Sequence, residues 1–185
     1  MLARIFGSRT SRIEEASWNT GATPNVVKRR QLPIEALPTH DEVLDTAYHY
    51  WHSKRRQGLL PSRNDIDILE ITKIIKHTHL IDVSSDKTED WCFRVVGAVV
   101  PQTWQWGCGR DKISDCPWPP YRDMLLHDYG AVKFTGAPMY HEIAIRVDWV
   151  AYHYSRIVLP FADDGRSVDN LMSCVFHRDT PDLPL

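Results

Sequence analysis

The sequence predicts an α+β domain built on one five-stranded antiparallel sheet. Three strand-like runs joined by tight turns close the chain between residues 136 and 178. Two earlier strand-like runs cover residues 77–83 and 91–96. An irregular segment, residues 98–120, and a helix predicted over residues 121–129, with Gly130 as its stop, separate them from the closing strands. Two strands, a helical crossover and a three-stranded meander fit a single sheet with helices on one face. An N-terminal helix is expected to cover the other face or to form a dimer contact.

The last two closing strands are apolar on both of their faces. They flank Asp163-Asp164-Gly165, a turn signal between two runs rich in β-branched and aromatic residues. Apolar side chains occupy both parities of residues 150–159 and of residues 171–176. A strand with this pattern is covered on both faces. The sequence therefore predicts a second cover on the outer face of the sheet, either the N-terminal helix or another subunit.

That N-terminal helix is predicted over residues 39–57. Thr39 and Glu42 have the spacing of a capping box, and Gly58 supplies a stop. Apolar residues recur between them at helical spacing and form one stripe, which has to lie on another surface. We expect the outer sheet face or a dimer contact to receive Val43, Ala47 and Trp51.

Composition limits the domain count and the classes of partner. The chain has 185 residues, of which 43% are hydrophobic and 25% are charged, and this suits one globular domain with an extension. The net charge of −2 indicates neither nucleic acid nor membrane as a partner. Residues 1–38 carry six arginines and lysines against three glutamates, a net charge of +3 that leaves −5 for the remainder. We expect a mobile basic arm over residues 1–38, a folded domain over residues 39–178 and a tail over residues 179–185.

The cysteines and the hydropathy pattern favour a cytoplasmic protein. No paired spacing of the metal-binding or redox kind relates Cys92, Cys108, Cys116 and Cys174. The start of the sequence has no signal-peptide core, and no run approaches the ~18 apolar residues of a membrane span. Free thiols in a reducing compartment are therefore expected.

A set of short motifs accompanies the predicted order of elements between residues 40 and 178. The motifs are Trp51 near Arg55 and Arg56, Leu60-Pro61-Ser62-Arg63 with Asp65-Ile66, Leu80-Ile81-Asp82-Val83, Phe93-Arg94-Val95-Val96-Gly97, Gly109-Arg110-Asp111 and Leu159-Pro160-Phe161-Ala162-Asp163-Asp164-Gly165. Together they resemble a bacterial PAS-like domain family common in alphaproteobacteria. The resemblance implies a sheet that cups a ligand or a packing core against the intervening helices. It also implies a sensory or regulatory module, although a fold alone does not fix a function.

On this resemblance we expect a non-enzymatic homodimer that binds a small ligand, a protein signalling partner or both. Its signal would pass through the helix of residues 39–57. Arg63 lies in a constrained connector, where its planar guanidinium can reach Asp65, Asp82 or a carbonyl cluster. Arg94 is either a buried pairing partner or a solvated side chain, and for both arginines we favour a structural role. The motif residues with an expected structural role are Trp51, Arg63, Asp65, Arg94 and Gly97.

The expected pocket combines residues of the irregular segment, the following helix and the closing strands. Cys108 takes the place of the flavin-reactive cysteine of light-sensing PAS domains, but the flanking residues depart from that pattern, so flavin is not supported. His127 lies near the axial-ligand position of haem-binding PAS domains, and without an orienting partner it does not support haem. The tryptophans of the irregular segment either wall a pocket or fill the core. The expected pocket residues are Trp104, Trp106, Cys108, His127, His141, Tyr152 and His153.

Two other functions are left open by the sequence. An inward-facing His141 with Tyr152 and His153 could perform acid–base chemistry in a cupped cavity, which would make the chain a small-molecule enzyme. A core filled by the protein's own aromatic side chains would leave a pure protein-interaction module. No metal site is predicted, because each histidine pair in the chain supplies only half of a ligand set.

Overall fold

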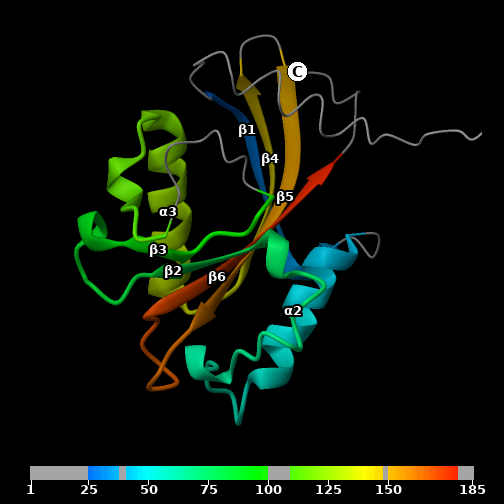
Figure 1. The fold of residues 1–185 in the computed structure, drawn as a ribbon, viewed down its shortest axis with the longest axis vertical. Helices are drawn as coiled ribbons and strands as arrows, with labels where there is room; N and C mark the ends of the chain where they lie inside the picture. The colour runs from blue at the N-terminus through cyan, green and yellow to red at the C-terminus, as the bar shows by residue number, and fades with distance from the viewer. Residues whose placement is uncertain (1–24, 38–40, 100–108, 148–149, 179–185) are drawn as a thin grey trace, which may run out of the picture.

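The computed structural model describes residues 25–37, 41–99, 109–147 and 150–178. Within these ranges one antiparallel sheet of six strands lies between two α-helices, α2 (Glu42–Lys54) and α3 (Pro119–Thr135), as Figure 1 shows. The α+β class is therefore confirmed, although the sheet has six strands where the sequence predicts five. Thr39, Trp104, Trp106 and Cys108 lie outside the described residues, as do residues 1–24 and the expected tail.

The strands run in the spatial order β1-β4-β5-β6-β2-β3. The three closing strands form an antiparallel meander in the middle of the sheet, and β6 pairs with β2. Strands far apart in the sequence are thus joined in one surface. The strands are β1 (Asn25–Leu32), β2 (Thr78–Asp82), β3 (Cys92–Val95), β4 (Met139–Val147), β5 (Val150–Phe161) and β6 (Asn170–Arg178).

The additional strand β1 comes from residues that the sequence assigns to a mobile basic arm. Residues 25–32 instead pair with β4 along an edge of the sheet. The strand has a basic centre and no alternating apolar pattern, so local sequence gives no strand signal. The described contacts of β1 are with residues distant in sequence. Its backbone pairs with β4, Arg30 forms an ion pair with Glu142, and Arg29 forms an ion pair with Asp128. Long-range pairing therefore decides the conformation of this segment.

The outer face of the sheet is covered by α2. Leu44, Ala47 and Trp51 are buried against β5 and β6, whereas Val43 is half-buried. The indole Nε1 of Trp51 donates a hydrogen bond to the carbonyl oxygen of Pro160 at 2.7 Å, which anchors the helix to β5. The outer apolar parity of the closing strands thus packs against the chain's own helix. The strand residues in this layer include Ile157, Leu159, Phe161, Met172 and Cys174.

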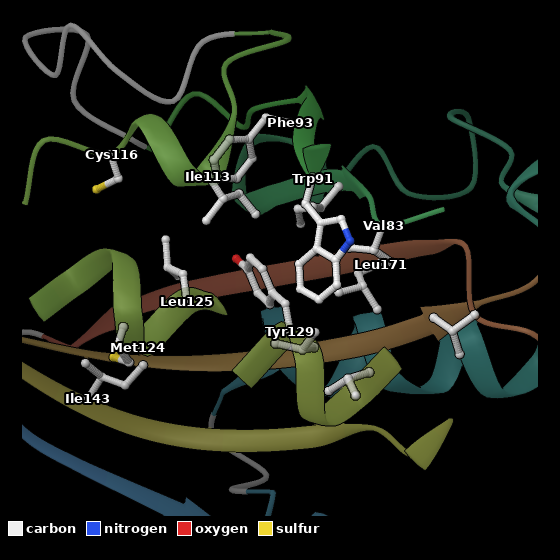
Figure 2. Close-up of a cluster of buried hydrophobic side chains, with 14 of the residues drawn as sticks. Val83, Trp91, Phe93, Ile113, Cys116, Met124, Leu125, Tyr129, Ile143 and Leu171 are labelled. Carbon is white, nitrogen blue, oxygen red and sulfur yellow. The ribbon is translucent and has the colours of Figure 1, made fainter. Parts of the chain in front are cut away.

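The inner face is covered by α3, together with the segments around β3 and residues 113–116. Figure 2 shows the side chains of Tyr129 and Leu125 of α3 in one cluster with those of Trp91, Phe93 and Ile113. Trp118, which precedes α3, also packs against this layer. The two apolar parities of the closing strands thus belong to two separate cores, one beneath each helix.

Both helices differ in length from their sequence predictions. The first begins after Asp41 and ends at Lys54, inside the expected range. The second is predicted over residues 121–129 with Gly130 as its stop, but it continues for more than a turn. Its C-cap is Gly136, which has φ +63° in the left-handed region that glycine readily adopts. A glycine at residue 130 stays helical because tertiary packing on the inner core outweighs its weak helix preference.

Candidate functional site

A group of charged and polar side chains is buried between α3 and the sheet. We call Arg29, Asp128, His141 and Arg156 the α3 polar cluster. His141 and Arg156 are direct cross-strand partners on β4 and β5. Asp128 belongs to the stripe of α3 that also buries Leu125 three residues earlier, so helical spacing turns it toward the sheet.

Asp128 is the centre of the cluster. Its Oδ2 pairs with Nη2 of Arg156, and its Oδ1 lies 2.9 Å from Nη2 of Arg29 and 3.9 Å from Nε2 of His141. The side chains of Asp128 and His141 are 0% exposed and that of Arg156 is 2% exposed, whereas that of Arg29 is 27% exposed. The charged groups are therefore removed from solvent except on the side of β1.

The cluster has hydrogen-bonding capacity that the described residues do not use. Both ring nitrogens of His141, and Nε and Nη1 of Arg156, are buried and have no hydrogen-bond partner within the described part of the chain. About nine in ten buried polar groups in proteins have a partner, and each orphan costs on the order of 1–3 kcal/mol. Several orphans on two adjacent side chains indicate a place where a ligand or ordered water binds.

The electrostatics of the cluster favour a neutral histidine. Burial, and then the positive charge of Arg156, lower the pKa of His141 to about 4. Near neutral pH the cluster therefore contains two arginines, one carboxylate and an uncharged imidazole. Its formal charge is +1, and the half-exposed Arg29 contributes part of it.

Tyrosine side chains border the cluster. The guanidinium of Arg156 lies 5.6 Å from the ring centroid of Tyr129, in cation–π range. Burial raises the pKa of Tyr154 to about 12, and burial also raises the pKa of Tyr121 and Tyr129. These phenols stay protonated at neutral pH, so they provide O–H groups and add no negative charge.

Comparison of the chain with protein-family models, with curated proteins and with solved structures finds no match. Within the described ranges, no group of three or more histidine, cysteine and acidic side chains is arranged to hold a metal ion. Among the same residues, no helix has both the length and the apolar character needed to cross a membrane.

The structure brings together only part of the expected pocket. Trp104, Trp106 and Cys108 lie outside the described residues. His127, expected to face the sheet, has a side chain that is 66% exposed, because it lies one position before Asp128 on the helix. Its Nδ1 is 3.2 Å from Oδ1 of Asp128, so it meets the cluster only at the rim.

The three residues of the acid–base alternative do not share one described site. His141 is in the cluster on the α3 side of the sheet. His153 has the opposite strand parity, that of Ile157 and the outer core. Tyr152 lies in β5 opposite Ile145, and only its backbone is described.

Three members of the α3 polar cluster, Arg29, Asp128 and Arg156, are not among the site residues that the sequence predicts. Arg156 lies between Tyr154 and Val158 on the same, otherwise apolar face of its strand. A single charged residue on a buried face indicates that the charge is paired with an opposite charge. Asp128 gives a similar signal on the apolar stripe of α3. Arg29 gives no such signal, because its strand has no apolar pattern.

The motif residues outside the cluster have structural surroundings. Arg94 forms an ion pair with Asp82 on the neighbouring strand. Asp65 accepts a hydrogen bond from the backbone N–H of Ser62 in a capping box, whereas Arg63 is exposed. Gly97 is buried and donates its N–H to Nδ1 of His79 at 3.2 Å. These contacts fix connectors and strand ends.

Proposed function

We propose that this chain is a non-enzymatic, PAS-like sensory or regulatory domain that binds a small ligand between α3 and the sheet. The observation that carries the proposal is the unused hydrogen-bonding capacity of His141 and Arg156 inside a buried cluster. A protein evolved only for stability would gain by replacing such a cluster with apolar side chains of similar volume. A cluster retained at this cost is better explained by a bound molecule.

The order of the strands supports the same proposal. Two strands, a helical crossover and a three-stranded meander occur in the order on which the PAS resemblance rests. The meander returns to β2 through β6, so β4-β5-β6-β2-β3 is a five-stranded unit to which β1 is added at one edge. Such a unit leaves one sheet face for a ligand and the other for a helix.

Catalysis is less well supported than binding. His141 and His153 belong to opposite parities of their strands, so the two histidines of the acid–base alternative are separated by the sheet. A general base working near neutral pH needs a pKa close to 7, and that of His141 is lowered to about 4. Its unpaired nitrogens suit hydrogen bonding to a ligand better than proton transfer.

The proposed signal leaves the domain through α2. Successive residues of β5 alternate between the two cores, so Arg156 contacts the inner cluster while Ile157 packs in the α2 layer. A ligand that shifts Arg156 therefore acts on the strand that supports α2. Beside this helix, the turn of residues 67–70 is tied to Tyr50 and exposes Leu69 at 80%. We propose this exposed turn as a contact for a second copy of the chain or for a signalling partner.

Native mass spectrometry of the full chain purified from cells tests the proposal. We expect a population heavier than the apoprotein by a small-molecule mass, released on unfolding. The same measurement on His141→Phe should lose that population, whereas His49→Gln, an exposed histidine on α2, should retain it. A wild-type chain that carries no small molecule and gains no stability from a metabolite library would contradict the proposal.

A further inference from the structure

We infer that the α3 polar cluster binds the carboxylate group of a small monoanion, held by the guanidinium of Arg156 and the imidazole of His141. This inference rests on the proposed ligand-binding function and names the ligand class. It is carried by three observations: the balance of donors and acceptors in the cluster, its charge, and the side of the fold on which it meets solvent.

The unused groups of the cluster are mainly donors. Arg156 contacts Asp128 through Nη2, and its remaining N–H groups on Nε and Nη1 are unpaired among the described residues. A guanidinium has no acceptor, and a neutral imidazole supplies one donor and one acceptor. Nε–H and the N–H groups of Nη1 point in different directions, because each shares a fork with Nη2 and Nη2 already pairs with Asp128. The ligand group must therefore accept a hydrogen bond from one of these donors, and it can accept a second from His141. A carboxylate has two acceptor oxygens for this purpose, and its hydrogen bond to a charged guanidinium is a strong one.

The charge of the cluster selects a monoanion. Arg29 and Arg156 are balanced by one carboxylate, that of Asp128, and His141 is neutral. One negative charge brings the buried group to neutrality. A cation or a dianion leaves an uncompensated charge in a region removed from water, which is strongly unfavourable.

The surroundings limit the ligand to a small molecule that enters beside β1. Apolar side chains of the inner core lie next to the cluster on the same helix or strand faces: Leu125 on α3, Ile143 on β4 and Val158 on β5. Arg29 is its only member with substantial exposure within the described structure, and the exposed His127 lies 3.4 Å from it. The ion pair from Arg29 to Asp128 joins the edge strand β1 to α3, so we place the entry of the ligand on this side of the cluster. Arg29 is the first positive charge that an entering anion meets.

Acetate and acetamide form the matched probe pair for this inference, because they have nearly the same shape and differ in charge. Thermal unfolding and isothermal titration calorimetry of the full chain are measured in sodium acetate, in acetamide and in sodium chloride at equal ionic strength. We expect acetate to raise the melting temperature in a saturable way, as linkage requires of a ligand that binds only the native state. Acetamide and chloride should give no such increase.

Substitutions assign the effect to the cluster. Arg156→Lys retains a positive charge beside Asp128 but removes the unpaired Nε and Nη1 donors, and should weaken acetate binding at least tenfold. The side chain of Arg156 is buried, so the Arg156→Lys variant can fail to fold. Arg29→Gln is therefore measured in parallel, because the side chain of Arg29 is partly exposed and its replacement is less disruptive to folding. It should weaken acetate binding by severalfold. Arg30→Gln is the control, since Arg30 lies on the same strand and pairs with Glu142 on the other sheet face.

The outcomes separate the inference from the proposed function. No response to acetate, together with a retained neutral small molecule in native mass spectrometry, overturns the carboxylate inference and leaves the ligand-binding function standing. No acetate response and no retained molecule overturn both, and buried water would then satisfy the cluster. An acetate effect of equal size in Arg29→Gln and Arg30→Gln would place binding elsewhere and overturn the inference.

Discussion

Asp128 of α3 and Arg156 of β5 form an ion pair in which both side chains are buried between the helix and the sheet. Such a pair positions α3 on the meander by a directional contact, which the non-directional burial of apolar side chains does not supply. Arg29 extends the pair to the edge strand β1. One carboxylate therefore connects the crossover helix, a central strand and the edge of the sheet.

The first prediction concerns removal of that carboxylate. Asp128→Asn leaves Arg156 buried without its counter-charge, and breaking one partner of a buried pair typically costs about 3–5 kcal/mol in the free energy of unfolding. Urea unfolding followed by circular dichroism measures the loss. Glu142→Gln, which removes the half-exposed pair with Arg30, should cost less than about 1 kcal/mol. Equal losses in the two variants would show that the buried pair has no special role.

The second prediction concerns pH. Burial is the main cause that lowers the pKa of both His79 and His141 to about 4, from an unfolded value of 6.5. Between these values the unfolded chain binds more protons than the native chain, so stability increases with pH through this window. The contribution of these histidines to the free energy of unfolding should be complete above about pH 6.5. It should be lost as the pH falls toward 4, by about 3 kcal/mol per histidine.

Urea titrations at intervals between pH 4 and pH 7 measure this dependence. His141→Gln should flatten the curve by one histidine's share. The carboxyl groups of Asp82, Asp90 and Asp164 have lowered pKa values, so their loss of stabilisation lies below this window. A flat profile from pH 7 to pH 4 would contradict the buried, neutral state of the two histidines.

The third prediction concerns Gly97. A Cβ at this position would lie 2.9 Å from the backbone nitrogen of Thr78 and closer still to the carbonyl oxygen of Lys76. Because backbone atoms cannot move aside as a flexible side chain does, Gly97→Ala should reduce the free energy of unfolding by about 1–3 kcal/mol or more. Gly109→Ala is the control, since its nearest heavy atom, the carbonyl oxygen of Arg94, is 3.9 Å away. Similar unfolding midpoints for the two variants would rule out this close approach.

The fourth prediction concerns the attachment of α2. Trp51→Phe removes the hydrogen bond to Pro160 and reduces the volume that fills the outer core, so a loss of about 1–3 kcal/mol in the free energy of unfolding is expected. Tyr48→Phe, on the same helix, removes a hydroxyl from a half-buried ring and should cost less than about 1 kcal/mol. Denaturant titration compares the two. If α2 were only loosely attached, both substitutions would be neutral.

Local pattern was sufficient for much of the fold. The closing strands carry their own turn signal and β-rich composition, and the stripe of α2 is periodic, so both were predicted close to their observed positions. The extension of α3 beyond Gly130 was not predicted, because only contact with the inner core keeps that turn helical. The α3 polar cluster was found only in part, with His141 as its single predicted member.

The sequence by itself determined the α+β class, the closing meander and the double cover of its strands, because these depend on periodicity and turn chemistry within short segments. Tertiary structure alone decided that residues 25–32 form a strand, and that Arg29, Asp128 and Arg156 meet His141. The reason is physical. An edge strand without an apolar pattern is held by backbone pairing with a distant segment, and a buried charge is stable only where folding supplies its counter-charge.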